Sequence, residues 1–308
     1  MFRLTSTIVS LLLASSGAHA GAPRVTVDIA PVHSLVAQVM DGVGVPELLL
    51  QGNASPHSYA LRPSQAGSLE KSDIVVFTSG RLTPWLLGPL DSLASGAAQL
   101  ELMSLKGTIH HDFRGDHEDH DHDHDHGHEH DGEHGEDLLD PHGWLDPENA
   151  KVWVQELAKA LSAADPEHRQ TYAENAARAV RELDALSSNL SDQLSGVQSQ
   201  SYMALHDAFQ YFDRRFGPQY AGSIALGDAA APSPARIAKA REQLREHDVT
   251  CVFTEPQQND RLVHVVLEGS NAKAGVLDAI GAELSPGPDL YSDLLRALAR
   301  SFADCLAD

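Results

Sequence analysis

Basic residues are scarce in this chain. Its 22 Lys and Arg face 44 Asp and Glu, which gives a formal net charge of −22. Residues 116–137 hold eleven of these acidic residues and no basic one, so this short segment carries half of the net charge. Nucleic acids and anionic membranes attract proteins through basic patches. The composition therefore argues against both as partners, and it is compatible with a cationic ligand.

Long hydrophobic runs are also absent. The apolar stretch around residues 8–14 is far shorter than the roughly 20 residues that span a membrane, and serines and a glycine follow it. A charged start at residues 1–3 and the small-residue motif at Ala18–Ala20 complete the pattern of a secretory signal peptide. We predict cleavage after Ala20 and export to the periplasm. Since this leader contains no cysteine, no lipid anchor is expected, and the shortness of its apolar run argues against direct membrane insertion.

Cysteine is limited to two residues, Cys251 and Cys305. In an exported chain an isolated pair is most simply a disulfide bond. The alternative is a pair of soft metal ligands, but the two lie far from every histidine cluster and lack the C-x-x-C spacing of zinc sites. A structural role is the better interpretation.

Histidine, in contrast, is abundant and concentrated. Ten of the 18 histidines lie between His110 and His134, and residues 120–130 read HDHDHDHGHEH. Dense imidazole suits Zn, Cu and Ni, while the interleaved carboxylates attract divalent cations. The acidic segment cannot bury apolar area, so we expect a mobile loop over residues 110–137. Its accessory metal-binding histidines would be His117, His120, His122, His124, His126, His128, His130 and His134.

Outside this loop, short β-rich runs alternate with helical segments. The predicted strands cover residues 25–30, 47–50, 73–78, 100–103, 201–205, 220–226, 249–254 and 274–277. The predicted helices cover residues 33–40, 146–163, 233–246, 260–268 and 291–306, besides one longer helix that follows Pro166. This alternation is typical of an α/β fold with parallel sheets built from βαβ units.

The helix after Pro166 is much longer than the others, because apolar residues recur at steps of three and four from Tyr172 to Leu194. A helix of this length in mid-chain is suited to join two lobes. We predict an N-terminal α/β lobe over residues 21–165, a linking helix over 166–197 and a C-terminal α/β lobe over 198–308.

Three further histidines lie in loops or at strand ends: His57 in SPHSY, His142 in DPHGW and His206 in LHDAF. Ligands of open α/β folds bind at the carboxyl ends of strands. One such histidine would usually be a hydrogen-bonded structural residue. Three of them in a chain that carries a metal-collecting loop instead indicate a metal site. By contrast, His33 is expected to pack at a helix start, and three helical histidines to serve as surface or packing residues, namely His168, His247 and His264.

Four segments around these residues, 56–64, 140–147, 205–212 and 253–257, resemble those of the cluster A-I periplasmic metal-binding proteins of ABC importers, in particular the zinc-specific ZnuA type. The resemblance covers nearly the whole mature chain, with the His-rich loop between the first two motifs. It implies two Rossmann-like lobes with parallel sheets, joined by one long backbone helix, and zinc in the cleft between them. It also implies that His57, His142 and His206 are the zinc ligands, and it is consistent with a bond between Cys251 and Cys305.

The chain departs from some of these relatives at one place, where Pro56 replaces a Glu that completes their coordination. The fourth ligand is therefore open. Asp278 stands where manganese-type relatives supply a carboxylate, while water or a histidine of the loop would fill the position equally well. Glu255 is expected to shape the cleft.

The sequence thus predicts a monomeric periplasmic protein that captures Zn and delivers it to the membrane permease of a zinc ABC importer. A zinc hydrolase also uses three histidines and one open position, but the chain has no H-E-x-x-H helix and no obvious general base beside a ligand. We therefore expect no enzyme. The other alternative is a zinc storage or buffering protein that acts through the His-rich loop.

Overall fold

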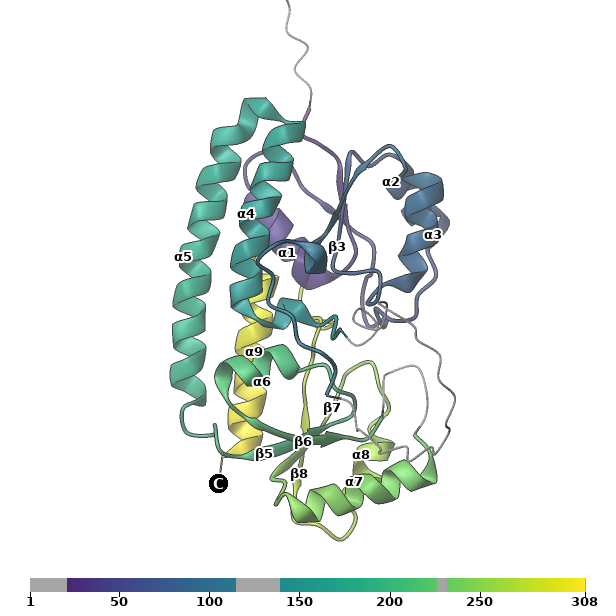
Figure 1. The fold of residues 1–308 in the computed structure, drawn as a ribbon, viewed down its shortest axis with the longest axis vertical. Helices are drawn as coiled ribbons and strands as arrows, with labels where there is room; N and C mark the ends of the chain where they lie inside the picture. The colour runs from purple at the N-terminus through teal and green to yellow at the C-terminus, as the bar shows by residue number, and fades with distance from the viewer. Residues whose placement is uncertain (1–20, 115–138, 226–231, 308) are drawn as a thin grey trace, which may run out of the picture.

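Two parallel sheets form the framework of the protein in its computed structural model (Figure 1), which describes residues 21–114, 139–225 and 232–307. The predicted signal peptide and the histidines from His117 to His134 lie outside these residues. The first sheet has the order β2-β1-β3-β4, with strands at Val25–Val27 (β1), Glu47–Leu48 (β2), Ile74–Phe77 (β3) and Ala98–Glu101 (β4). The second has the order β6-β5-β7-β8, with strands at Ser201–Ala204 (β5), Gln219–Ser223 (β6), Cys251–Thr254 (β7) and Lys273–Val276 (β8).

Helices cover both faces of these sheets. In the first half of the chain they are Ala30–Val39 (α1), Pro63–Glu70 (α2), Pro84–Leu93 (α3) and Pro147–Ala164 (α4). Then follow Arg169–Leu194 (α5), Gln210–Phe216 (α6), Pro234–Glu246 (α7), Arg261–Leu267 (α8) and Leu290–Leu306 (α9). The two sheets and their helices confirm the predicted α/β class. The prediction gave no helix for α2, α3 and α6, of which α2 and α6 are only 8 and 7 residues long.

Strand β1 ends earlier than the predicted run of residues 25–30. The buried Asp28 carboxylate accepts hydrogen bonds from the backbone N–H groups of Ile29 and Thr78, both at 2.7 Å. This turns the chain away from the sheet, so that α1 begins at Ala30. Pro31 fits at this helix start because its missing N–H is not needed in the first turn.

The predicted long helix is present as α5, with 26 residues and a short 3₁₀ turn at Pro166–His168 before it. In Figure 1 it runs along one side of the molecule past both sheets. It packs against α4 and α9, and α9 also packs against α1. Ser34 of α1 donates to the Pro288 carbonyl oxygen just before α9, at 2.8 Å. The C-terminal helix therefore joins the two halves as well, and the lobe boundaries at residues 165 and 197 stay predictions.

The largest core cluster is continuous between the sheets. It contains Val27 and Val76 of the first sheet, Tyr202 and Phe253 of the second, and the fully buried Trp144 between them. Trp144 donates to the Ala279 carbonyl oxygen at 2.7 Å. Because closely packed interiors resist deformation, the two sheets are held in a fixed relation by this shared core.

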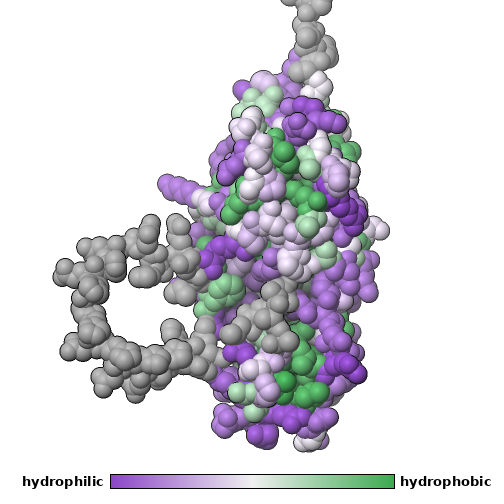
Figure 2. Space-filling model, turned by 90° about the vertical axis from the view of Figure 1, so that its right-hand side faces the viewer, coloured by the Kyte–Doolittle hydropathy of each residue, from purple (hydrophilic) through white to green (hydrophobic). Residues whose placement is uncertain are grey.

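Few of the described residues expose a large apolar side chain. On the face in Figure 2, hydrophilic residues predominate and the hydrophobic ones form small separate groups. None of the described helices is both long and apolar enough to cross a membrane.

Candidate metal centre

His57 lies in the loop between β2 and α2 and is half-buried. Its backbone N–H donates to the Ser55 hydroxyl at 3.1 Å, and Trp85 of α3 donates to the Pro56 carbonyl oxygen at 2.7 Å. Asn53 in the same loop donates across to the Pro256 carbonyl oxygen, at 2.8 Å. These contacts hold the loop against both halves of the protein.

His142 lies between the end of the predicted loop and the short 3₁₀ helix Gly143–Leu145. It is buried, and both its backbone N–H and its Nδ1 contact Asp140 Oδ1, at 3.0 and 2.7 Å. The other carboxylate oxygen of Asp140 accepts from Gln210 of α6 at 3.1 Å. Asp140 itself is fully buried, so the His142 ring is held by a fixed acceptor.

His206 follows β5, and its Nδ1 makes a short hydrogen bond with the Glu255 carboxylate. Glu255 follows β7, the neighbour of β5 in the second sheet. The carboxyl ends of neighbouring parallel strands lie at one edge, which explains how residues 49 positions apart come into contact. Both side chains are buried.

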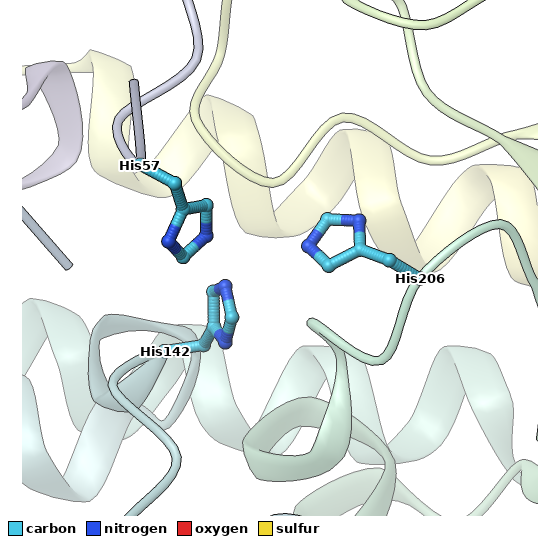
Figure 3. Close-up of side chains that lie close together, drawn as sticks. All are labelled: His57, His142 and His206. Carbon is cyan, nitrogen blue, oxygen red and sulfur yellow. The ribbon is translucent and has the colours of Figure 1, made fainter. Parts of the chain in front are cut away.

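The three imidazoles converge at one point (Figure 3). One nitrogen of each lies within 4.8 Å of the others, and the ring centroids are 5.4, 5.6 and 6.1 Å apart. His57 and His142 come from the first half of the chain and His206 from the second. The structure therefore brings together the three histidines that the sequence singles out, between the two sheets.

The two carboxylates determine which ring nitrogen faces this point. An ionised carboxylate only accepts hydrogen bonds, so Nδ1 of His142 and of His206 must carry the proton. This leaves each Nε2 with its lone pair available to a metal, the arrangement that is usual for metal-binding histidines. Three neutral nitrogen donors with an open fourth position suit Zn²⁺ far better than Mg²⁺ or Ca²⁺.

Asp278 is not part of the group. Its carboxylate accepts three backbone hydrogen bonds in its own loop, from Ile280, Gly281 and Ala282 at 3.1, 2.9 and 2.7 Å. Within the described residues, the one group of three or more potential metal ligands consists of these three histidines. The identity of a fourth ligand stays a prediction.

The other singled-out residues have structural contacts. Cys251 of β7 and Cys305 of α9 form a disulfide, with a Cα–Cα distance of 6.1 Å. His33 is buried, with its Nε2 3.0 Å from the Pro46 carbonyl oxygen. His168 contacts Asp165 at 2.7 Å.

Sequence reasoning missed two features of the centre. It did not identify Asp140 as the partner of His142, although Asp-x-His spacing was a usable signal. It also placed residues 110–114 in the mobile loop, whereas these residues make defined contacts in the structure. Asp112 forms an antiparallel bridge with Leu139, and the His111 backbone N–H donates to the Tyr211 hydroxyl oxygen at 3.1 Å. Backbone pairing and buried partners order this part of the loop.

Comparison with known proteins agrees with this geometry. The family described as "Zinc-uptake complex component A periplasmic" matches residues 25–305. A high-affinity zinc uptake system protein ZnuA of Brucella suis is 41% identical over 305 residues, covering 92% of this chain and 91% of that protein. A crystal structure of ZnuA has a TM-score of 0.77 at 21% identity and covers 93% of this chain and 100% of its own. A ZnuA deletion mutant with zinc bound has a TM-score of 0.76 at 21% identity, with 93% and 99% covered.

Proposed function

Because this chain belongs to the ZnuA family of zinc-uptake components, we propose that it captures Zn²⁺ with His57, His142 and His206 and delivers the ion to the permease of an ABC importer. The observation that carries this proposal is the convergence of the three imidazoles, with one nitrogen of each within 4.8 Å of the others. The donor set also fits zinc chemically, since borderline-soft imidazole nitrogen is a preferred ligand of this ion.

The position of the site indicates how bound zinc would change the surface that a permease contacts. His142 and His206 are supported by buried carboxylates from opposite halves of the chain, Asp140 and Glu255. His57 lies on a more exposed loop. An ion bound to all three would tie this loop to both halves. Since the core is continuous and α5 and α9 span both sheets, the response would be a local rearrangement around the cleft, not a wide hinge motion.

We further propose that the protein acts in the periplasm as a monomer without catalytic activity, after removal of residues 1–20. Zinc is its cargo, and the permease is the partner to which it is released. The histidines from His117 to His134 would serve as an accessory, weaker collector of zinc. Storage through this tract alone is less favoured, because it leaves the organised three-histidine cluster without a role.

A chelator-competition zinc titration of the exported protein tests the proposal. It compares the intact protein, a deletion of residues 116–137 and the same deletion with His57→Ala and His206→Ala. This deletion spares Asp112 and Arg114, which contact the folded protein. We expect one tight site that survives the deletion and disappears in the double variant. If the deletion of residues 116–137 abolished all tight zinc binding, the protein would instead be a storage protein.

A further inference from the structure

Residues 109–114, here called the stem, connect the two supports of the metal centre. At one end the Ile109 N–H donates to the Asn149 side chain at 2.6 Å, and Asn149 in turn donates to the Gly143 carbonyl oxygen, next to His142, at 3.1 Å. Farther along, Gln210 donates both to the Asp112 carbonyl oxygen and to Asp140, at 2.9 and 3.1 Å. The stem is thus fixed to the groups that hold His142.

Arg114, at the other end of the stem, is fixed to the group that follows His206. Its guanidinium donates two hydrogen bonds to the Asp207 carboxylate, at 3.1 and 2.7 Å, and a third to Asp213 at 2.8 Å. It also lies 3.8 Å from the centre of the Tyr220 ring. Because the guanidinium makes a two-pronged contact and also lies over an aromatic ring, both its orientation and the position of its positive charge are fixed.

Burial makes this contact strong. Only 19% of the Arg114 side chain is exposed, against 11% for Asp207 and 4% for Asp213. Burial raises the pKa of Asp213 to about 6. The Arg114 guanidinium forms ion pairs with both carboxylates, at 2.7 Å from Asp207 and 2.8 Å from Asp213. Without it, neighbouring buried acids would face each other uncompensated, and the loop after β5 would rearrange.

We propose that Arg114 is a positioning residue for zinc binding: it holds Asp207, and through the adjoining backbone His206, in register with His142. This inference rests on the proposed function of the three histidines. It assigns the stem to the scaffold of the metal centre and separates it from residues 116–137, whose removal would leave the centre intact.

The test measures three properties of Arg114→Gln and Arg114→Lys in the intact exported protein. These are the zinc dissociation constant by chelator competition, the visible absorption spectrum with Co²⁺ in place of zinc, and the thermal unfolding midpoint without metal. The matched control is Arg24→Lys. Arg24 makes the same two-pronged contact with Asp73, at 3.2 and 3.1 Å, but before β3, at the amino edge of the first sheet.

We expect Arg114→Gln to weaken zinc binding about tenfold, the lower end of the loss that follows removal of a direct partner of a metal-bound histidine. Arg114→Lys, which keeps the charge but loses the fork, would weaken it at least about threefold. Both would alter the Co²⁺ spectrum, whereas Arg24→Lys would change neither property. Should Arg114→Gln not fold, Arg114→Lys decides the question.

An unchanged zinc affinity and Co²⁺ spectrum in Arg114→Lys, with tight binding in the intact protein, would overturn the proposal, even if the unfolding midpoint falls. Such a result would make Arg114 a contributor to stability alone. Absence of a tight site from the intact protein would be a different failure, since it would overturn the proposed function itself.

Discussion

The two sheets share one topology but differ at the edge where their strands end. In each, two central parallel strands lie between two edge strands, in the orders β2-β1-β3-β4 and β6-β5-β7-β8. The first sheet has Asp28 after β1 and Thr78 after β3, joined by a hydrogen bond of 2.7 Å. At the corresponding places the second sheet has His206 after β5 and Glu255 after β7, also hydrogen-bonded.

The difference shows what the fold supplies and what it leaves to the residues. A parallel sheet brings two strand ends together in either half. In the first sheet the pair closes on itself, because both Asp28 oxygens accept backbone N–H groups. In the second sheet the carboxylate occupies only Nδ1 of His206, so Nε2 of this ring remains directed at the metal centre. The same edge carries a structural contact in the first half and the proposed ligand His206 in the second.

Replacing His206 by Ala should have the largest effect, because it removes the proposed ligand from the edge of the second sheet. The binding free energy of structural zinc sites with four ligands is roughly 10–16 kcal/mol, so each ligand contributes about 2.5–4 kcal/mol. His206→Ala should therefore weaken zinc binding by about two to three orders of magnitude, as measured by chelator competition. Asp28→Asn, at the corresponding place of the first sheet, should leave the affinity unchanged. Equal losses in both variants would contradict the assignment of the site to the second sheet's edge.

The disulfide gives the second half of the chain a source of stability that the first sheet lacks. Cys251 and Cys305 are 54 positions apart and join β7 to α9, whereas the first sheet contains no cysteine. Replacing both by Ser should lower the free energy of unfolding by about 4 kcal/mol, because the unfolded chain gains freedom. Urea denaturation measures this loss. Zinc affinity well below the transition should remain, and its disappearance would show that the bond also shapes the metal centre.

Asp28 should give the first sheet a pH dependence of its own. Burial raises its pKa to about 6 from an ordinary 3.8. A raised pKa means that the stability linked to this group is fully present below pH 3.8 and is lost as the pH rises through 6. Between pH 4 and 7 the intact protein should lose about 2.4 kcal/mol of unfolding free energy relative to Asp28→Asn. Denaturant unfolding of both proteins at the two pH values measures the change; a constant difference would contradict it.

Glu255→Gln gives the smallest expected effect. The amide oxygen can still accept from His206 Nδ1, but without the negative charge the imidazole becomes a weaker donor to the metal. Zinc affinity should fall about tenfold, which is about 1.4 kcal/mol. Glu283→Gln, at an exposed position 28 residues further along the chain, is the control. An unchanged affinity in Glu255→Gln would show that this carboxylate serves packing alone.

Much of the architecture could be predicted because it depends on local patterns. Apolar spacing predicted α5, and Ser233-Pro234 and Asp146-Pro147 marked the starts of α7 and α4, where Ser233 and Asp146 do cap the helices. Alternating short strands and helices indicated parallel sheets. The ends of strands could be predicted less well. Strand β1 stops at Val27 because of the buried contact between Asp28 and Thr78, which are 50 positions apart in the sequence.

The histidines of the centre could be identified from their loop positions and from the resemblance, but their supports depend on tertiary contacts. The distance between Glu255 and His206 in the sequence hides their hydrogen bond. Arg114 lay within a segment whose composition indicates mobility, and nothing in its neighbourhood predicts the contacts with Asp207 and Asp213. These contacts are made between parts of the chain 93 and 99 positions apart.

The most direct test of the account is a crystal structure of the exported protein with zinc, with anomalous diffraction recorded at the zinc edge. The account predicts a strong peak bonded to one nitrogen each of His57, His142 and His206 at about 2.0 Å, with Nδ1 of His142 and His206 still on Asp140 and Glu255. A zinc peak at other residues, with these three imidazoles empty, would contradict the central claim.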